Sequence, residues 1–570
     1  MNQSDSSNTD LSGGIASSTT AQPGNATRGM YKPLKQSAQG VTDADESTAL
    51  AANRKGQNGG GQRHYTDLPV DDTDGDIDDD GVQDEDDAPW EDEGTSKGKK
   101  FILLTVFLIL GAAVLLPFNT LVTPTEYYRH LFSHKEGGSE SFLSWVLVVY
   151  NGSTIAFGAH ATLSMNKTTP SRRIYLSMSV ILISLALLVT SASQLPSFSK
   201  MQTVGWFYGL LTGTFVIAAS SAYLQNAVTA LCSIFGGQAM GLMLAGQGAV
   251  GVVISLVQLG AAYNNVAKSS LSYEGEDGGD EPSVGGGGVA ATRTATMLFT
   301  FAACFTVFSV FAFAWLARTP EYKKTVRAYD NARGRGDDSA GGRQESQSRQ
   351  SGRSQRPPSP DGSLISTAIQ QVVPEENQHG AYEILAVQRK ILSLTLSLFA
   401  LFSVTLAVYP AVTARVTSTN PNGSMPSLVF VAFHLVCFNS ADLLGRTLPS
   451  VSSERFVIRS RKAIVGITAA RILLVPLFLA CNVRSANGES GGGIQGITLP
   501  DWIFFLLVSI FGLTNGLLAT TIFVVGSTDG EDNDLKNEEE RANAGAILSF
   551  WLTTGLAAGS VLSFAVGAAV

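Results

Sequence analysis

The sequence predicts an all-α protein that crosses a membrane eleven times, and three features of its 570 residues lead to this fold class. Apolar residues are gathered in stretches that reach about 20 residues, the length an α-helix needs to cross a bilayer. Eleven such stretches occur, and a soluble chain very rarely contains so many. They form a group of six and a group of five on either side of one long polar segment.

The composition divides the chain into four parts, which are 1–100, 101–317, 318–390 and 391–570. The second and fourth parts contain the expected membrane-spanning helices. In the first group these are Phe101–Val122, Phe142–Leu163, Ile174–Ala192, Gly205–Leu231, Ala239–Tyr263 and Ala291–Ala317. In the second group they are Ile391–Val412, Leu428–Leu444, Ala463–Cys481, Trp502–Val525 and Ala544–Val570.

The two polar parts, 1–100 and 318–390, are expected to be disordered. The first is rich in Ser, Gly, Asn, Asp and Glu, and the second in Arg, Gly, Ser and Gln. Neither can bury enough apolar area to offset the loss of chain entropy. The acidic run Asp67–Glu93 accounts for much of the net charge of −9, and Ser359 in the central segment is a candidate phosphorylation site.

The distribution of lysine and arginine predicts that the N-terminus is cytoplasmic. With this orientation the cytoplasmic loops contain Arg172, Arg173, the arginine-rich segment 318–390 and the basic run 455–462. The opposite loops contain only scattered basic residues. An odd number of spans then places Val570 on the far side of the membrane.

Three polar residues in the eighth stretch are the first candidates for a functional site. Asn439, Asp442 and Arg446 are separated by three and four residues, which places them on one face of a helix. Pairing of Asp442 with Arg446 would lower the cost of two charges inside a membrane. Such a face could bind a sugar hydroxyl or the edge of a base. The alternative is a structural ion pair near the cytoplasmic end, with Arg446 extending to water.

Polar residues also occur in the fourth and first stretches. Gln225 and Asn226 carry donors and acceptors that suit the edge of a nucleobase, although, taken alone, they are better explained by hydrogen bonds between helices. In the first stretch Pro117 removes a helical hydrogen bond. Phe118 could stack on a base and Asn119 could line a site; the alternative is an ordinary proline kink with a phenylalanine that faces lipid.

Three further residues in the spans are expected to have structural roles. Gly248 and Gly251 in the fifth stretch would allow a neighbouring helix to approach closely. Arg471 lies in the middle of the ninth stretch, where an unpaired charge would be costly. We expect it to pair with a carboxylate or with carbonyl groups at a helix end.

Several classes of function are disfavoured. The sequence contains no Walker loop, no metal-ligand spacing and no nucleophile elbow. We therefore expect neither an enzyme nor an ATP-driven pump, and no metal, cofactor or nucleic-acid partner. The four cysteines fall within apolar stretches, so a disulfide framework is not expected.

Seven collinear fragments of the membrane region resemble the equilibrative nucleoside transporter family. The most specific are 115–119, which resembles the Leu-Pro-Trp-Asn signature of the family's first helix, and 438–446, which is similar to the signature of its eighth. The other fragments are 224–225, 245–251, 409–413, 471–482 and 514–516.

The resemblance implies a major-facilitator-like fold, in which pseudo-symmetric groups of six and five helices rock around a central site. It implies that Gln225 hydrogen-bonds the nucleobase and that Asp442 and Arg446 hold the ribose region or the network that supports it. By position, the residues of the site would be Leu115, Phe118, Asn119, Gln225, Asn439, Asp442 and Arg446. The residues of structural motifs would be Pro117, Gly248, Gly251, Pro410, Gly445, Arg471 and Asn515.

Two positions depart from the family pattern. Phe118 stands where many members have tryptophan, which gives a smaller stacking surface without an indole donor. Asn226 follows the motif glutamine where some relatives have glycine, which would narrow the cavity. These departures leave the preference among bases open.

The expected function is passive transport of purine and pyrimidine nucleosides such as adenosine and uridine, with nucleobases as further candidate substrates. The expected membrane is the plasma membrane or the vacuolar or lysosomal membrane. Asp442 is ionisable and could couple protons, although pairing with Arg446 would hold it ionised and oppose that role. Rival functions are a carrier of a different polar solute, a sensor of the same fold that does not transport, and a membrane-embedded enzyme.

Overall fold

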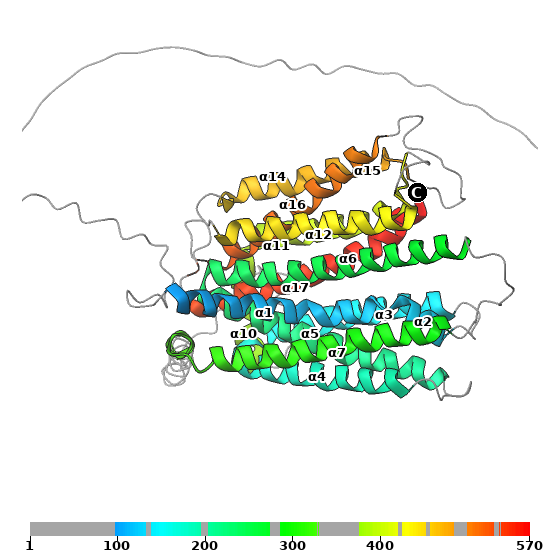
Figure 1. Ribbon diagram of the computed structural model, residues 1–570. Helices are drawn as coiled ribbons and strands as arrows, with labels where there is room; N and C mark the ends of the chain where they lie inside the picture. Colours follow the sequence, from blue (N-terminus) through cyan, green and yellow to red (C-terminus); the bar gives the residue numbers. More distant parts are fainter. Residues whose placement is uncertain are drawn as a thin grey trace, which may run out of the picture. The chain divides into compact units, whose positions relative to one another are not determined.

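The computed structural model describes residues 97–132, 138–194, 203–273, 286–327, 329, 375–419, 425–451, 456–483, 499–528, 535 and 537–569. The expectations for Asp67–Glu93 and Ser359 lie outside these residues. Helices that run roughly side by side dominate the described part of the chain (Figure 1). Its β structure is limited to one isolated bridge between Val416 and Val483.

The first group of helices covers the described residues from 97 to 316. Its members are α1 (Lys97–Val122), α2 (Thr125–Leu131), α3 (Gly138–Leu163), η1 (Met165–Lys167), α4 (Pro170–Gln194), α5 (Thr203–Phe235), α6 (Gly237–Tyr273) and α7 (Gly286–Leu316). The second group covers the described residues from 375 to 569. Its members are α10 (Glu375–Lys390), α11 (Leu392–Val408), η4 (Thr413–Arg415), α12 (Ser427–Val451), α14 (Arg461–Ala470), η5 (Arg471–Leu473), α15 (Leu474–Leu479), α16 (Asp501–Ser527) and α17 (Glu538–Ala569).

Eleven helical segments of the described chain are long and apolar enough to cross a membrane. Six precede the central segment and five follow it, which confirms the all-α class, the number of spans and their division. Each of these segments coincides with one of the apolar stretches of the sequence. The apolar length of a stretch therefore identified every span.

Several spans differ from their predicted bounds, and three of them are informative. The ninth is interrupted, because α14 ends at Ala470 and η5 separates it from α15. Pro476 in α15 contributes to this break, since it has no N–H to donate to the preceding turn. The eighth span continues past Leu444 to Val451. The eleventh begins six residues before Ala544 with three glutamates, which suit the positive end of a helix dipole.

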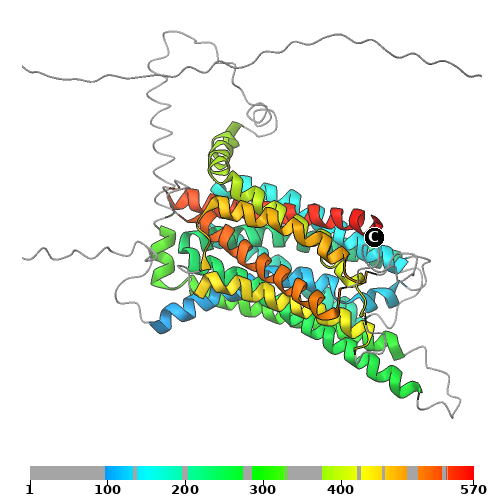
Figure 2. The same ribbon diagram turned by 90° about the horizontal axis from the view of Figure 1, so that it is seen from above.

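The expectation of disorder for 318–390 is wrong at both ends of the segment, because residues 320–327 are helical and α10 forms at the C-terminal end (Figure 2). Ala381, Ile384 and Val387 are buried and share one face of this helix. The mixture of these residues with charged ones lowers the overall apolarity of the segment and hides the pattern. Lys390, at the end of α10, forms an ion pair with Glu540 of α17, with 2.8 Å between its Nζ and Oε1.

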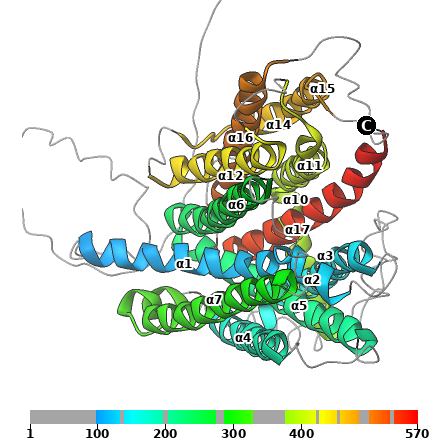
Figure 3. The same ribbon diagram turned by 45° about the vertical axis from the view of Figure 1, so that its right-hand side comes forward.

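Helix α6 lies between α1 and α12 and belongs to the contact surface of both groups (Figure 3). Its contact with α1 is a backbone contact. A Cβ at Gly111 would stand 1.8 Å from the carbonyl oxygen of Met243, and one at Gly246 would stand 2.0 Å from that of Leu108. Only glycine permits this approach at both positions.

We call the end of the bundle where α1 begins and α5 ends the proximal end. There α17 of the second group packs against α3 and α5 of the first. The Asn226 amide nitrogen on α5 donates to the Ala546 carbonyl oxygen on α17 at 3.3 Å, and Thr162 on α3 donates to the same oxygen. The two groups are thus joined by hydrogen bonds at the proximal end.

A single residue, Gly236, connects α5 to α6 at the proximal end. Its φ is 97°, a value that side-chain-bearing residues rarely adopt. Helix α5 packs against α17, whereas α6 packs against α12. Two helices of the first group that contact different helices of the second group are therefore joined by a one-residue turn.

Candidate functional site

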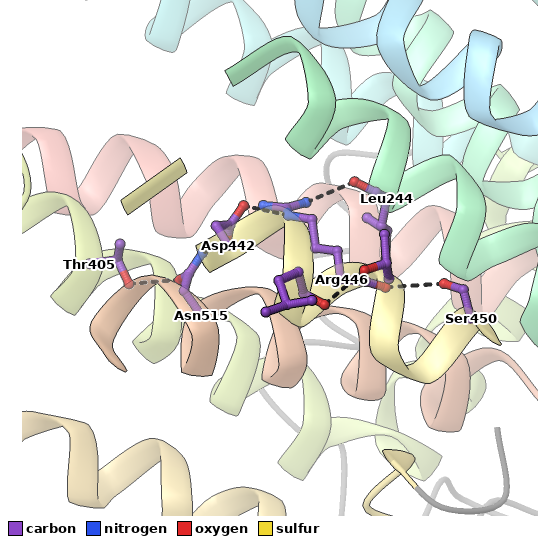
Figure 4. A network of polar contacts seen from close by, with 8 residues as sticks. Leu244, Thr405, Asp442, Arg446, Ser450 and Asn515 are labelled. Atoms are coloured by element: carbon purple, nitrogen blue, oxygen red, sulfur yellow. Dashed lines mark hydrogen bonds and ion pairs between the residues drawn. The ribbon is translucent and has the colours of Figure 1, made fainter. Parts of the chain in front are cut away.

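An ion pair lies on α12, inside the bundle (Figure 4). The Nε of Arg446 donates to Oδ2 of Asp442 at 2.6 Å, and both side chains are less than a tenth exposed. The pairing that the spacing predicted is present. Arg446 does not extend to water, because its Nη1 points at the carbonyl oxygen of Leu244 on α6, 3.4 Å away. The alternative interpretation, in which the guanidinium of Arg446 extends to water, is therefore wrong.

The pair is positioned by close contacts of α12 with α16. A Cβ at Gly516 would stand 2.0 Å from the carbonyl oxygen of Asp442, and one at Gly445 would stand 2.2 Å from that of Leu513. The two helix backbones therefore touch on both sides of the ion pair. This contact also places Asn515 next to the carboxylate, and its Nδ2 donates to Oδ1 of Asp442 at 2.7 Å.

The opposite side of the pair faces α6. Gly248 and Gly251 lie against Arg446 and Asn439, because Cβ atoms at these glycines would stand 3.0 Å from Cδ of Arg446 and 2.8 Å from Oδ1 of Asn439. The two glycines that the sequence assigned to helix packing thus leave room for polar side chains of α12. The ion pair lies between a helix of the first group and a helix of the second.

Asn439 lies on the same face of α12, as the spacing predicted. Its Nδ2 donates to the carbonyl oxygen of Leu435 at 2.9 Å and to Oη of Tyr409 at 3.4 Å. The Tyr409 ring stacks on Phe438 with 3.8 Å between the ring centroids. Pro410 follows directly, just beyond the end of α11. These contacts attach the end of α11 to the polar face of α12.

A chain of hydrogen bonds continues from Asp442 through Asn515 to the middle of the second group (Figure 4). Thr405 on α11 donates from Oγ1 to Oδ1 of Asn515 at 2.9 Å, and Arg471 donates from Nη2 to Oγ1 of Thr405 at 3.0 Å. Arg471 contacts no carboxylate in the described part of the chain. It donates instead to the carbonyl of Phe511, which lies inside α16 and not at a helix end as the sequence suggested.

Gln225 on α5 and Gln247 on α6 form a second polar contact. Nε2 of Gln247 donates to Oε1 of Gln225 at 2.8 Å, and Nε2 of Gln225 donates to Thr229 at 3.2 Å. Both glutamines are buried. Gln247 and Leu244 are three residues apart on α6, so the Gln225 pair and the Arg446 contact lie about one helical turn from each other along α6.

Asn226 is separated from this layer. Its Nδ2 donates to Oγ1 of Thr162 on α3 at 2.9 Å and to the carbonyl oxygen of Ala546 on α17. Asn226 therefore forms hydrogen bonds between helices, which was one of the two interpretations of the sequence. The side chain therefore holds α3, α5 and α17 together at the proximal end.

The three candidates on α1 make contacts within α1 and with α3. The Phe118 ring is half-buried and packs on Tyr150, with 4.8 Å between the ring centroids. The Asn119 Nδ2 donates to the carbonyl oxygen of Leu115 at 3.1 Å. Pro117 lies inside α1, which continues through it. The described contacts do not join these residues to Asp442, Arg446 or Gln225.

Sequence reasoning did not single out Thr405 or Tyr150. Thr405 is one hydroxyl in a stretch of apolar residues, and threonine in a membrane helix usually bonds to its own backbone. Tyr150 stands on α3 between an apolar run and Asn151, and no spacing marks it. The only signal for Tyr409 was its place beside Pro410 in a motif fragment.

Comparison with known proteins identifies the family to which this chain is similar. A family model described as Nucleoside transporter matches residues 211–568. Equilibrative nucleoside transporter 2 of Mus musculus is 32% identical over 199 residues, which are 34% of this chain and 40% of that protein. Nucleoside transporter FUN26 of Saccharomyces cerevisiae is 24% identical over 487 residues, which are 82% of this chain and 84% of that protein.

A solved structure of the major facilitator superfamily, the proton:xylose symporter XylE, is also similar. It has a TM-score of 0.48 and 13% identity, and the match covers 80% of this chain and 88% of that chain. The chain spans well under half the length of the mouse relative in its alignment, and most of the length of the yeast relative. Because the family match covers more than half of the chain, the protein belongs to the nucleoside transporter family.

Proposed function

We propose that the protein carries nucleosides across a membrane by alternating access between its two groups of helices, without ATP. Family membership and the names of the mouse and yeast relatives support the substrate class. A binding site near the middle of the membrane, between two halves of the chain, is the usual arrangement in such carriers. The proposed substrates are nucleosides such as adenosine and uridine, and nucleobases are a further candidate.

The observation that carries this proposal is the buried Asp442–Arg446 pair between α12 and α6. At a rise of about 1.5 Å per residue, Asp442 lies about 22 Å from the start of α12 and about 14 Å from its end. Intramembrane charges at such a depth usually mark a substrate or ion path. We assign ribose recognition to Asp442 and Arg446, supported by Asn439, because a carboxylate accepts and a guanidinium donates to sugar hydroxyls.

The remaining residues of the proposed site come from the first group. Gln225 would bind the edge of the base, since its amide carries both a donor and an acceptor. Leu115, Phe118 and Asn119 would approach the substrate from α1. The contact of Phe118 with Tyr150 gives this side an aromatic surface suited to the flat face of a base.

Charge balance supports passive transport. Arg446 and Arg471 are both buried close to one buried carboxylate, Asp442. Protonation of Asp442 would leave both guanidinium groups without a compensating charge inside the membrane, which is costly. A proton-coupled cycle would pass through that state, so we favour the facilitative mechanism over proton coupling.

We propose that the proximal end faces the cytoplasm, which puts the N-terminus there and the C-terminus on the far side. Exposed basic residues occur at this end, among them Lys167, Arg172, Lys323 and Arg327. An excess of lysine and arginine is characteristic of cytoplasmic loops. The bilayer that holds the protein would be the plasma membrane or that of a vacuole or lysosome.

Uptake of labelled uridine and adenosine into proteoliposomes, at two imposed pH gradients, tests the proposal. The matched variants are Gln225→Ala and Gln258→Ala, because Gln258 is half-buried on α6 without a hydrogen-bond partner in the described chain. We expect saturable uptake that ignores the gradient, falls strongly in Gln225→Ala and persists in Gln258→Ala. Uptake that follows the gradient would replace the passive mechanism by a proton-coupled one. No uptake by folded wild-type protein would refute nucleoside transport and favour a sensor.

A further inference from the structure

Arg471 is a buried cation that lies outside the proposed substrate site. It is 2% exposed and begins η5, the short segment at which the ninth span is interrupted. A charge at such a place is expensive unless the protein solvates it. The contacts that solvate Arg471 are therefore informative about its role.

The Arg471 guanidinium contacts two other helices. Nη2 donates to Thr405 on α11 at 3.0 Å, and Nη1 donates to the carbonyl of Phe511 on α16 at 2.9 Å and to the hydroxyl of Thr514. The guanidinium also lies over the Phe511 ring, 4.2 Å from its centroid. In an α-helix the Phe511 carbonyl accepts from the N–H of Asn515, four residues on. Arg471 therefore contacts both the side-chain partner of Asn515 and the helical turn that carries it.

The hydrogen bonds between Arg471 and Asp442 all run in one direction. Arg471 donates to Thr405, Thr405 donates to Oδ1 of Asn515 at 2.9 Å, and Nδ2 of Asn515 donates to Oδ1 of Asp442 at 2.7 Å. Bonds aligned in this way polarise and strengthen one another. Arg446 completes the arrangement from the other side by donating to Oδ2 of Asp442. The carboxylate is thus held at both oxygens.

The orientation of the Asn515 amide depends on Thr405. With Nδ2 toward Asp442, Oδ1 faces the Thr405 hydroxyl and requires a donor there. Thr405 has one hydrogen and two acceptors within reach, Oδ1 of Asn515 and the Leu401 carbonyl oxygen at 2.7 Å. Arg471 donates to the Thr405 oxygen and so occupies one of its lone pairs. The Thr405 hydroxyl therefore accepts from Arg471 and uses its hydrogen as the donor to another group. An Asn515 amide turned the other way would place its oxygen against the carboxylate, which is repulsive.

We propose that Arg471 is a positioning residue for the substrate site: through Thr405 and Asn515 it fixes the orientation in which Asp442 meets the sugar of a nucleoside. This inference rests on the function proposed above. Because Arg471 lies at the break of the ninth span, the chain of bonds connects the geometry of that break to recognition of the sugar hydroxyls. Arg471 itself does not touch the substrate.

The test measures dissociation constants of purified protein for uridine and for 2′,3′-dideoxyuridine, which lacks the 2′ and 3′ hydroxyls of the sugar and keeps the 5′ hydroxyl. Thr405→Val removes the relay and keeps the branched shape of the side chain, and Thr405→Ser restores the hydroxyl. Arg471→Lys keeps the charge but cannot reach Thr405 and Phe511 with one planar group. The matched control is Thr520→Val on α16, because Thr520 is buried and its hydroxyl has no partner in the described part of the chain.

We expect Thr405→Val and Arg471→Lys each to weaken uridine binding about fivefold, which corresponds to about 1 kcal/mol for one hydrogen bond. The double variant should be no weaker than either single one, since both changes interrupt the same chain. Dideoxyuridine binding should change little, and Thr405→Ser and Thr520→Val should bind uridine like the wild type.

Four results would overturn the inference. Equal losses for the two ligands would show that the 2′ and 3′ hydroxyls are not involved, which would overturn the inference. Additive losses in the double variant would show that Arg471 and Thr405 act independently. A lowered melting temperature with unchanged binding would make the role of Arg471 purely structural. Wild-type protein that binds neither ligand would refute the proposed function itself, and the inference with it.

Discussion

The substitution Gly516→Ala tests the contact between α12 and α16, because it adds a single methyl group where the two helices touch. The new Cβ would stand 2.0 Å from the carbonyl oxygen of Asp442 and 2.9 Å from the backbone nitrogen of Arg446. Non-bonded carbon and oxygen atoms need about 3.3 Å, so the helices must separate by about 1.3 Å. Neither obstacle is a flexible side chain, and the backbones themselves have to move.

This movement would have two consequences. Overpacking of this kind costs about 1–3 kcal/mol of stability. The hydrogen bond from Asn515 to Asp442, now 2.7 Å, would lengthen to about 4 Å, which is beyond hydrogen-bond range. We therefore expect Gly516→Ala to lower both the melting temperature in detergent and the rate of nucleoside uptake.

The matched control is Gly466→Ala on α14, where a Cβ would meet nothing within 4 Å. Alanine stabilises a helix interior relative to glycine by about 1 kcal/mol, so this variant should melt at the wild-type temperature or slightly above. Thermal unfolding followed by tryptophan fluorescence, together with uptake into proteoliposomes, measures both quantities. If Gly516→Ala matched Gly466→Ala in both assays, the close contact of α12 with α16 would be refuted.

Three further changes follow from the same contacts. Asp442→Asn leaves a buried guanidinium without its carboxylate and should destabilise the protein by about 3–5 kcal/mol in thermal unfolding; adding Arg446→Gln should recover part of the loss, and no recovery would argue against the pair. Asn226→Ala removes a hydrogen bond between the two groups of helices, so Cys232, buried nearby on α5, should react faster with a thiol reagent when it is the only cysteine. Glu540→Gln removes a partly exposed ion pair and should lower the free energy of unfolding by less than about 1 kcal/mol, which thermal unfolding measures. A larger loss would show that α10 contributes more to stability than its contacts indicate.

The sequence was sufficient for the spans and for the polar face of α12. Apolar length alone identified each membrane helix, and the spacing of Asp442 and Arg446 predicted their ion pair because both lie on one helix. Both predictions rest on local information. A residue and its neighbours within one or two turns contained everything that was needed.

The partners of Arg471 could not be predicted in this way. Thr405 is 66 residues away and Phe511 is 40 residues away, so their proximity depends on how three helices pack. No pattern within any one of the helices marks Thr405 as the residue that faces Arg471. The same reason explains Asn226, whose side chain bonds to α17 because of the packing of α5 against it, and not because of its place beside Gln225.

The one-residue turn at Gly236 has a consequence for how the two groups of helices can part. It joins α5, which packs against α17, to α6, which packs against α12, and a turn this short cannot let the ends of the two helices move independently. Separation at one of these contacts must pull on the other. We therefore expect opening of the proximal end to be cooperative, with few molecules in which one contact is broken and the other intact.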